Sequence, residues 1–592
     1  MKSEQAQAIE AELLELVDVS QGWKLLERFN GLIRESGTAD EREAASYIAE
    51  RLQAMGIPVT LHEPELLISL PRQTEVEVAW PQGNSKLRAK TPSFSLSTGE
   101  EGRTAELVHL PAQQCRSVTD LFDHHFSSLD ADVRGKVVLT EGFAMPTTVR
   151  MLEQMGAAAQ VFIHPGKNIH EGICTTIWGT PTPSNIHRKP AVPVACINRE
   201  DGDRLVELVK GHSLQATVRT RLDEGWMKCL LPEVRIQGTE EPEQFLLVHG
   251  HYDSWHEGIG DNATGNAVLL ELARIFHQSR HRLRRSLRIA WWPAHSTGRY
   301  AGSTWYADRF AMDLRKHCIG QVNIDSPGCR QATNFDEVMW MLECDGLCRQ
   351  AIRDRTGKES HRLRPLRAGD YSFNQIGLSS FFMLLSNRPK QQRDELGFYP
   401  VGGCGGDIAW HTEDDTLEVA DRQIMLQDLA VYVTALNRVL NAHILPYDFR
   451  PVAQELREGL EAGRQAAGDA LTLDPVSNEL DRLKEELQDF HRFAGTPQGA
   501  TQADQVNRLL IELSRKLVPL NYARGERFDH DPAQSLGIIP KLEQLGRLAR
   551  LAKGSDEWRF QQAELIRQRN KVANTFYETA SMLRTARKLL GY

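Results

Sequence analysis

The chain has 592 residues, of which 41% are hydrophobic and 25% are charged, so it can bury several cores and predicts roughly three or four structural units. Its net charge of -9 argues against a nucleic-acid partner. The basic stretch 281–288 is interpreted as a solvated helix end and turn, with a phosphate-binding patch as the alternative. No apolar run is long enough to span a bilayer, so no membrane partner is expected. The polar N-terminus and the nine scattered cysteines predict a cytoplasmic protein.

A helix with marked ends is predicted over residues 36–56. Thr38 and Asp40 can cap its start, and Gly56 can terminate it. Apolar residues recur at helical spacing on one face, at Ala44, Ile48 and Leu52. A short strand is predicted to follow at Ile57–Leu61.

Residues 73–224 have a different character, with short strands, many turn residues and few long helical patterns. The expected elements are a strand in 133–140, a helix in 147–155, a strand in 160–164, and the segments 190–197 and 202–208. This block resembles the protease-associated domain, a small β-rich module that is inserted in several peptidases.

From residue 225 to residue 444, apolar strands alternate with helices. The predicted elements are Phe245–Val248, Thr264–Gln278, Leu287–Trp292, Gly302–Leu314 and Ile319–Ile324. Such alternation predicts an α/β domain with a largely parallel sheet. We expect residues 1–72 to join this domain, so that residues 73–224 form an insertion within it.

Residues 445–592 predict a helical domain. Apolar residues at 4-3-4-3 spacing cover about two heptads, which favours a helix packed in a bundle over an independent coiled coil: Val476, Leu480, Leu483, Leu487 and Phe490. Pro519 and the loop 523–539 are expected to interrupt the region. The fold class is therefore α/β, with a mixed, mainly parallel sheet flanked by helices, an inserted β-rich domain and a C-terminal helical domain.

Three loops at predicted strand ends carry side chains that could bind a metal. His251 and Asp261 lie in HGHYDSWHEGIGDNATG, residues 249–265, Asp325 ends the strand of VNIDSPG, and His411 lies in GGDIAWHTEDDT. Ligands bind beyond the carboxyl ends of the strands in an open α/β sheet. Each residue alone is more often a turn or structural residue, so the indication comes from the set. Imidazoles and carboxylates, one of them bridging, are what a two-metal hydrolytic site requires.

These motifs resemble those of the zinc aminopeptidase family that includes glutamate carboxypeptidase and the transferrin receptor. The resemblance covers nearly the whole chain, including the order of the domains. It implies that His251 and Asp325 bind one divalent metal, most simply zinc, that Asp261 bridges, and that His411 binds a second ion. Asp253 is better used as a partner that fixes the tautomer of His251.

The chain departs from this family at one point. The family carries two adjacent glutamates, a general base and a ligand of the second metal, where LRIAWWPAHSTGRYAGSTWYAD has His295 and Ser296. His295 could replace the base, since its ordinary pKa of about 6.5 suits that role. It could instead replace the missing ligand, or the site could have lost catalysis and only bind. A hydrogen-bonded core histidine is the structural alternative. We assign His295, Ser296 and Asp253 to the catalytic group.

The substrate is not defined by the sequence beyond a peptide or a small amide. Arg299 could bind a substrate carboxylate or make an ion pair within the domain, and Tyr300 should lie beside it. Asp370 and Tyr371, in RAGDYSFNQIG, match a family loop near the cleft and are predicted to contact substrate. His256 is interpreted as a surface histidine. Three tryptophans flank the ligand loops and could line a pocket or belong to the core: Trp255, Trp292 and Trp410.

The sequence therefore predicts a metal-dependent amide or peptide hydrolase. The alternatives are a non-catalytic binding protein and a single-zinc cyclotransferase of the glutaminyl cyclase type, which relies on the glutamate ligand that is missing here. The C-terminal domain resembles the dimer-forming part of glutamate carboxypeptidase, which predicts a homodimer. The inserted domain is expected to roof the active site and to limit access to small substrates.

Overall fold

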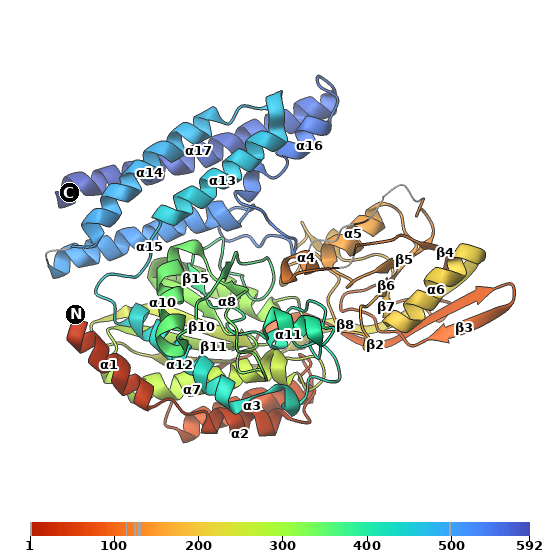
Figure 1. The fold of residues 1–592 in the computed structure, drawn as a ribbon, viewed down its shortest axis with the longest axis horizontal. Coiled ribbons are helices and arrows are strands. Elements are labelled where there is room, and N and C mark those ends of the chain that lie inside the picture. The colour runs from red at the N-terminus through yellow and green to blue at the C-terminus, as the bar shows by residue number, and fades with distance from the viewer. Residues whose placement is uncertain (1–2, 114, 123–125, 127–131, 497–498, 592) are drawn as a thin grey trace.

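The computed structural model describes residues 3–113, 115–122, 126, 132–496 and 499–591. An α/β region lies between a second sheet on one side and a layer of long helices on another (Figure 1). Within the described residues, every helix is too short or too polar to cross a membrane. The predicted fold class is confirmed, with a mixed sheet at its centre.

The central sheet has six strands. Their order is β1 (Val59–His62), β9 (Leu231–Ile236), β11 (Arg285–Trp292), β10 (Glu241–His251), β12 (Cys318–Asn323) and β15 (Ser380–Phe381). The last four run parallel, and β9 and β1 add an antiparallel edge. Strand β9 was not predicted, because Pro232 interrupts its apolar pattern. Parallel pairing brings the carboxyl ends of β10, β11 and β12 to one edge of the sheet.

Alternating side chains of β10 bury against helices on both faces of this sheet. Leu246 and Val248 pack with the core that includes α7 (Thr264–Gln278) and α12 (Arg422–Leu440). Phe245 and Leu247 pack on the other face, in the core that includes α8 (Ala301–Arg309) and α9 (Ala311–His317). Burial on both faces explains the continuous apolar run Phe245–Val248 in this strand.

The N-terminal helices pack on the α7 face of the central sheet. They are α1 (Ser3–Glu15), α2 (Ser20–Phe29) and α3 (Ala39–Ala54). Thr38 caps α3 by accepting a hydrogen bond from the Glu41 amide, and Gly56 follows the helix with a φ of 74°. Both predicted ends of this helix are thereby confirmed.

The helix predicted at Gly302–Leu314 is two helices. Phe310 leaves helical geometry, with φ -112° and ψ 20°, and separates α8 from α9. Its ring packs on that of His62 with centroids 5.7 Å apart, and the guanidinium of Arg235 lies 5.8 Å from its centroid. Ring packing that only the tertiary structure provides therefore breaks a continuous helical pattern.

A second sheet contains seven strands, most of them between residues 73 and 224. Their order is β3 (Gly83–Leu87), β2 (Glu65–Trp80), β8 (Leu214–Lys228), β4 (Arg103–His109), β5 (Val137–Glu141), β6 (Ala159–Ile163) and β7 (Val194–Ile197). The helices α4 (Val118–Phe122), α5 (Pro146–Gln154) and α6 (Arg199–Gly211) belong to the same region. The paired strands β2 and β8 connect it to the α/β region as one long antiparallel ribbon. The strand–helix–strand pattern predicted over 133–164 is confirmed by β5, α5 and β6.

Two short helices complete the α/β region, α10 (Asp345–Thr356) and α11 (Lys390–Glu395). The chain then continues into a helical layer of α13 (Arg450–Ala467), α14 (Asp474–Ala494), α15 (Ala500–Tyr522), α16 (Leu545–Arg550) and α17 (Asp556–Leu590). The predicted apolar face of α14 is buried, and the helix packs between α13 and α17. This confirms a bundle helix.

The helical layer is fastened to the α/β region by Arg515. Its buried guanidinium donates to the carbonyl oxygens of Leu314, Cys318 and Gly377. The expected interruption at Pro519 is wrong, because α15 continues through it to Tyr522. Buried apolar residues on both sides of the proline hold this last turn in place.

Candidate active site

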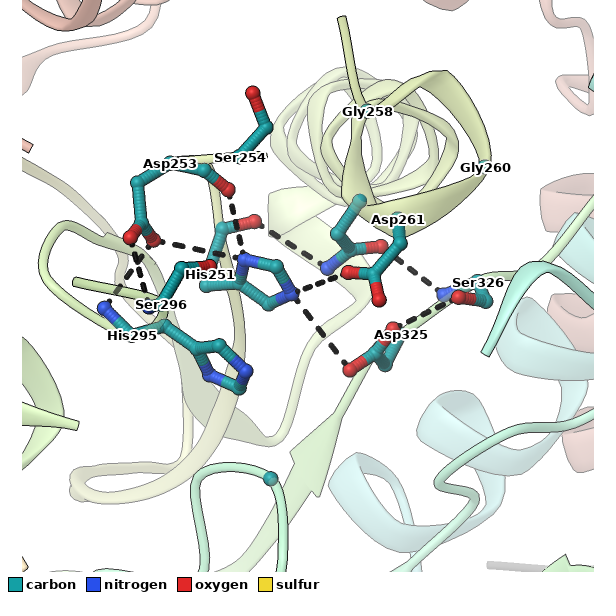
Figure 2. A network of polar contacts seen from close by, with 12 residues as sticks. His251, Asp253, Ser254, Gly258, Gly260, Asp261, His295, Ser296, Asp325 and Ser326 are labelled. Carbon is teal, nitrogen blue, oxygen red and sulfur yellow. Dashed lines mark hydrogen bonds and ion pairs between the residues drawn. The ribbon is translucent and has the colours of Figure 1, made fainter. Parts of the chain in front are cut away.

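Three of the predicted ligand residues, His251, Asp261 and Asp325, meet at the carboxyl edge of the central sheet (Figure 2). His251 is the last residue of β10, and Asp325 follows β12 by two residues. Asp261 lies in the loop before α7. His411 reaches the same place from a loop near the end of the α/β region. Segments that are 160 residues apart in the chain, from 251 to 411, therefore converge on one point.

Asp261 is the centre of this cluster. Its Oδ1 lies 2.9 Å from Nε2 of His251, and its Oδ2 lies 3.2 Å from Nε2 of His411. Asp325 Oδ2 lies 3.7 Å from the same nitrogen of His251 (Figure 2). Ligand atoms of His251, Asp261 and Asp325 all lie within 4.8 Å of one another. The two oxygens of Asp261 thus face two different imidazoles, as a bridging carboxylate requires.

The electrostatics of the cluster suit a divalent cation. Burial raises the pKa of Asp325, and the neighbouring carboxylate of Asp261 raises it further. Burial would also raise the pKa of Asp261, but His251 and His411 hold it well below its usual range. Nε2 of His251 is buried and faces both carboxylates, with Oδ1 of Asp261 as the nearer oxygen. Carboxylates gathered away from water need a cation to offset their charge, so these residues fit a metal.

The hydrogen bonds around the cluster hold both imidazoles with Nε2 turned inward. Nδ1 of His251 lies 2.9 Å from the main-chain oxygen of Asp253, and Nδ1 of His411 lies 3.0 Å from that of Glu171. Asp415 accepts from the amides of Gly260 and Asp261, and burial raises its pKa to about 7. Such partners set the orientation of metal-binding imidazoles.

The predicted role of Asp253 needs correction. Its main-chain oxygen, and not its carboxylate, is the closer partner of His251, since Oδ1 is 3.5 Å away. The carboxylate instead accepts from the amides of His295 and Ser296, at 3.2 and 2.8 Å, and from the Ser36 hydroxyl. Asp253 therefore fixes the turn that carries the altered pair.

His295 is held by a carboxylate. Its Nδ1 lies 2.8 Å from Oδ2 of Asp370, whose other oxygen accepts from the Ser303 hydroxyl at 2.7 Å. Its ring stacks on His251, with centroids 3.8 Å apart and planes 10° apart. His295 lines the cavity but offers no ligand atom to the cluster of His251, Asp261 and Asp325. Among the three interpretations, this geometry favours the base.

A cavity opens beside the cluster. Most of the predicted residues line it: Trp255, Asp261, His295, Ser296, Arg299, Tyr300, Asp325, Trp410 and His411. Asp370 and Tyr371, predicted to contact substrate, are not among its lining residues. Asp370 lies behind His295, and Tyr371 is buried with Met339 and Met383. Trp292 belongs to the core of the sheet.

Several wall residues were missed by the sequence analysis. Phe143, His170 and Glu171 reach the cavity from the second sheet region. Trp178, from the same region, packs on Tyr300 with ring centroids 4.0 Å apart. No motif marks these positions, because only the docking of the two regions brings them to the site. His256 is not a plain surface residue, since its ring faces Glu171 at 3.2 Å.

Five residues other than glycine at this site have a left-handed backbone: Ala294, Arg299, Tyr300, Ser326 and His411, with φ between 51° and 65°. Such conformations cost energy that the surrounding structure must offset, and they concentrate at functional sites. Two of them are consecutive, Arg299 and Tyr300, in the turn after the altered pair.

Arg34 holds the loop between His251 and Asp261 from below. Its fully buried guanidinium donates to the carbonyl oxygens of Tyr252, Glu257 and Gly258, at 2.8, 2.5 and 3.0 Å. No sequence motif indicated this residue. The conformation of the loop that carries Asp261 therefore depends on Arg34, which lies between α2 and α3, far away in the chain.

The fold places a candidate metal site at the carboxyl edge of the central sheet of an α/β domain. Residues 234–429 match the sequence model described as Peptidase family M28.

Relatives and solved structures agree with this match. Aminopeptidase NAALADL1 of Mus musculus is 23% identical over 395 residues, which are 59% of this chain and 51% of that protein. The chain thus spans about half the length of this curated relative. A Peptidase M28 precursor from Shewanella amazonensis superposes with a TM-score of 0.57 at 15% identity, covering 75% of this chain and 98% of that one. The zinc aminopeptidase BSAP from Bacillus subtilis gives 0.51 at 20% identity, covering 72% and 96%. These structures share the fold.

Replacing Arg34 should loosen the metal cluster. In Arg34→Met, three carbonyl oxygens lose their donor, and we expect the affinity for a divalent metal to fall by about 10- to 100-fold, the usual effect of losing a residue that supports metal ligands. Titration against a competing chelator measures this. Arg28→Met, which removes an exposed ion pair with Glu43, is the matched control. An unchanged affinity in Arg34→Met would mean that the loop holds its shape without the arginine.

Proposed function

We propose that the chain is a metal-dependent hydrolase that cleaves an amide bond in a peptide or a small amide. The observation that carries the proposal is the carboxylate of Asp261, whose oxygens face His251 and His411 at 2.9 and 3.2 Å. The M28 match and the likeness to proteins described as zinc aminopeptidases support zinc as the metal.

Four residues would hold the metal. His251 and Asp325 would bind one ion, His411 a second, and Asp261 would bridge them. A divalent ion bound here supplies Lewis acidity, which polarises an amide carbonyl and lowers the pKa of water. Ser296 stands where the resemblance places a carboxylate ligand, and a hydroxyl is a poorer ligand. We therefore expect the ion on the His411 side to be held more weakly.

His295 would move the proton. Asp370 holds its Nδ1, which leaves Nε2 free to accept a proton from the attacking water and to return it to the leaving amine. The arrangement of a carboxylate behind an imidazole also stabilises the charged ring while it carries the proton. Stacking on His251 keeps the base beside the cluster.

The second sheet region would act as a protease-associated module that limits access. Its residues Phe143, His170 and Glu171 form part of the cavity wall. The Glu171 amide donates to the carbonyl oxygen of His411, and the Glu171 carbonyl oxygen lies 3.0 Å from Nδ1 of His411. A wall attached in this way to a ligand loop favours small substrates over folded proteins.

Metal content is the first test of the proposal. Elemental analysis of the purified chain should find about one or two equivalents of a divalent metal. Asp261→Ala should lose most of it, because both ion positions share this carboxylate. Asp414→Ala, an exposed carboxylate on the His411 loop, should retain it. Absence of metal after incubation with zinc, manganese or cobalt would instead support a binding protein on the same fold.

Replacing His295 separates a base from a ligand. In His295→Ala, we expect turnover to fall by about 10²- to 10⁴-fold, the usual contribution of a general base, with metal content unchanged. Asp370→Asn should lower turnover by a smaller factor, because it removes only the orienting partner. Loss of metal in His295→Ala would show that His295 is a ligand. Unchanged turnover and metal content would remove His295 from the mechanism.

We also propose that the chain forms a homodimer through its helical layer. Large apolar side chains on α17 are exposed, with Phe560 at 73% and Leu589 at 80%. Light scattering at micromolar concentration should give twice the chain mass of 66.8 kDa. Phe560→Glu should shift the mass toward the monomer, because burying a charge in the interface is costly. A monomeric mass for the unaltered chain would contradict the dimer.

A further inference from the structure

Arg299 is a buried cation in the cavity wall that has no carboxylate partner. Its residue is only 8% exposed, and among the described residues no ion pair reaches it. Its one side-chain hydrogen bond is long, 3.4 Å from Nη1 to the hydroxyl of Tyr300, and its buried Nε makes none. The guanidinium lies against the rings of Tyr300 and Trp178, at 4.8 and 5.7 Å. Burying a charge without a partner is costly, so such a group is expected at a ligand site.

A neighbouring arginine, Arg367, has a structural role and can be compared with Arg299. Arg367 is also buried and lies 3.7 Å from the ring of Trp178. Its two terminal nitrogens donate to the carbonyl oxygens of Tyr371 and Asp531, at 2.9 and 2.8 Å. Arg367 thus ties the C-terminal loop to the wall. The Arg299 side chain makes no comparable pair of hydrogen bonds within the described part of the protein.

The cavity offers no free negative charge that could hold an ammonium group. Among its described lining residues, the acids are Glu171, Asp261 and Asp325. Glu171 is already paired with Lys90 at 3.0 Å and with His256 at 3.2 Å. The two aspartates belong to the metal cluster. The charge that remains available to a substrate is therefore the positive charge of Arg299.

Arg299 and an aromatic wall are connected to Asp261 through different imidazoles, His251 and His411. His295 stacks on His251 at 3.8 Å, Tyr300 meets His295 at 4.7 Å, and Arg299 lies against Tyr300. At the second imidazole, Trp410 stacks on His411 at 3.8 Å, and Phe143 meets Trp410 at 5.9 Å. An extended ligand across the cluster would have a cation at one end and aromatic rings at the other.

We propose that Arg299 recognises a free carboxylate on the amine side of the scissile amide, and that the wall of Phe143 and Trp410 takes an apolar acyl group. The substrate class is then an N-acyl amino acid or a short peptide with a free carboxyl end. This inference rests on the proposed hydrolase function. Water adds its hydroxyl to the acyl carbon and a proton to the nitrogen as the C–N bond breaks. The products are a carboxylic acid and a free amino acid.

Two ligands of similar size test the inference. N-benzoylglycine carries the carboxylate, and N-propylbenzamide replaces it by an ethyl group. Binding to the zinc-loaded chain is measured by calorimetry, and turnover is measured in parallel. The unaltered chain should bind and cleave N-benzoylglycine about 10- to 100-fold better, the usual value of hydrogen bonds to a charged group. Phenylalanine propylamide, which carries an ammonium group and no carboxylate, should be the poorest of the three.

Arg299→Met should weaken binding and turnover of N-benzoylglycine about 10- to 100-fold and so remove the preference for the carboxylate over the ethyl group. Arg299→Lys, which keeps the charge but not the paired donors, should be intermediate and covers the case that Arg299→Met does not fold. Arg309→Met, an exposed arginine at the other end of α8, is the matched control and should behave as the unaltered chain.

The two proposals fail in different ways. Carboxylate-dependent binding without turnover would support the role of Arg299 and contradict the hydrolase. Equal binding of both benzoyl compounds, or no binding of N-benzoylglycine, would overturn the role of Arg299 even if other amides are cleaved. A preference that persists in Arg299→Met would show that the carboxylate binds the metal and would likewise overturn it.

Discussion

The carboxylate of Asp261, shared between His251 and His411, is the contact on which the site depends. It links a loop after β10 with a loop that follows 150 residues later, from 261 to 411. Such a cluster of buried carboxylates and imidazoles is electrostatically unfavourable by itself, because removing each charge from water costs free energy. The surrounding contacts, Asp415 under Asp261 and Arg34 under the preceding loop, serve to hold these groups in place.

The altered pair changes how this site would carry out hydrolysis. In the proposed mechanism His295 would take the place of a carboxylate base. An imidazole base needs a partner to fix its tautomer, and Asp370 lies 2.8 Å from its Nδ1. Asp253 holds the turn through the two amides of the pair. The imidazole therefore occupies a prepared position, and this argues against decay of the site. The loss of the second carboxylate would weaken the binding of the metal ion on the side of His411.

Three parts of the chain that lie far apart in the sequence together form the cavity. The α/β region supplies the cluster, the second sheet region supplies Glu171 and the aromatic wall, and a C-terminal loop packs Ala533 against Trp178 and Tyr300. The same packing buries Arg299 and removes it from water. A cation enclosed in this way can discriminate between neutral and anionic substrates, because the free energy of an unpaired buried charge is recovered only when a carboxylate arrives.

By itself, the sequence determined the features that depend on local pattern. The cap at Thr38, the apolar runs of β10 and β12, and the polar residues at their ends follow from spacing and from side-chain chemistry, and these placed His251 and Asp325 at strand ends and Asp261 in the loop after β10. His411, expected at a strand end, instead lies in a loop 30 residues after β15. Only the tertiary structure decided what lies opposite those ends. Asp370 was expected to face substrate and instead supports His295, the helix through Phe310 breaks where its ring packs, and Arg299 proved to have no ion-pair partner. Each of these outcomes is a contact between segments far apart in the chain, which no periodicity within one segment records.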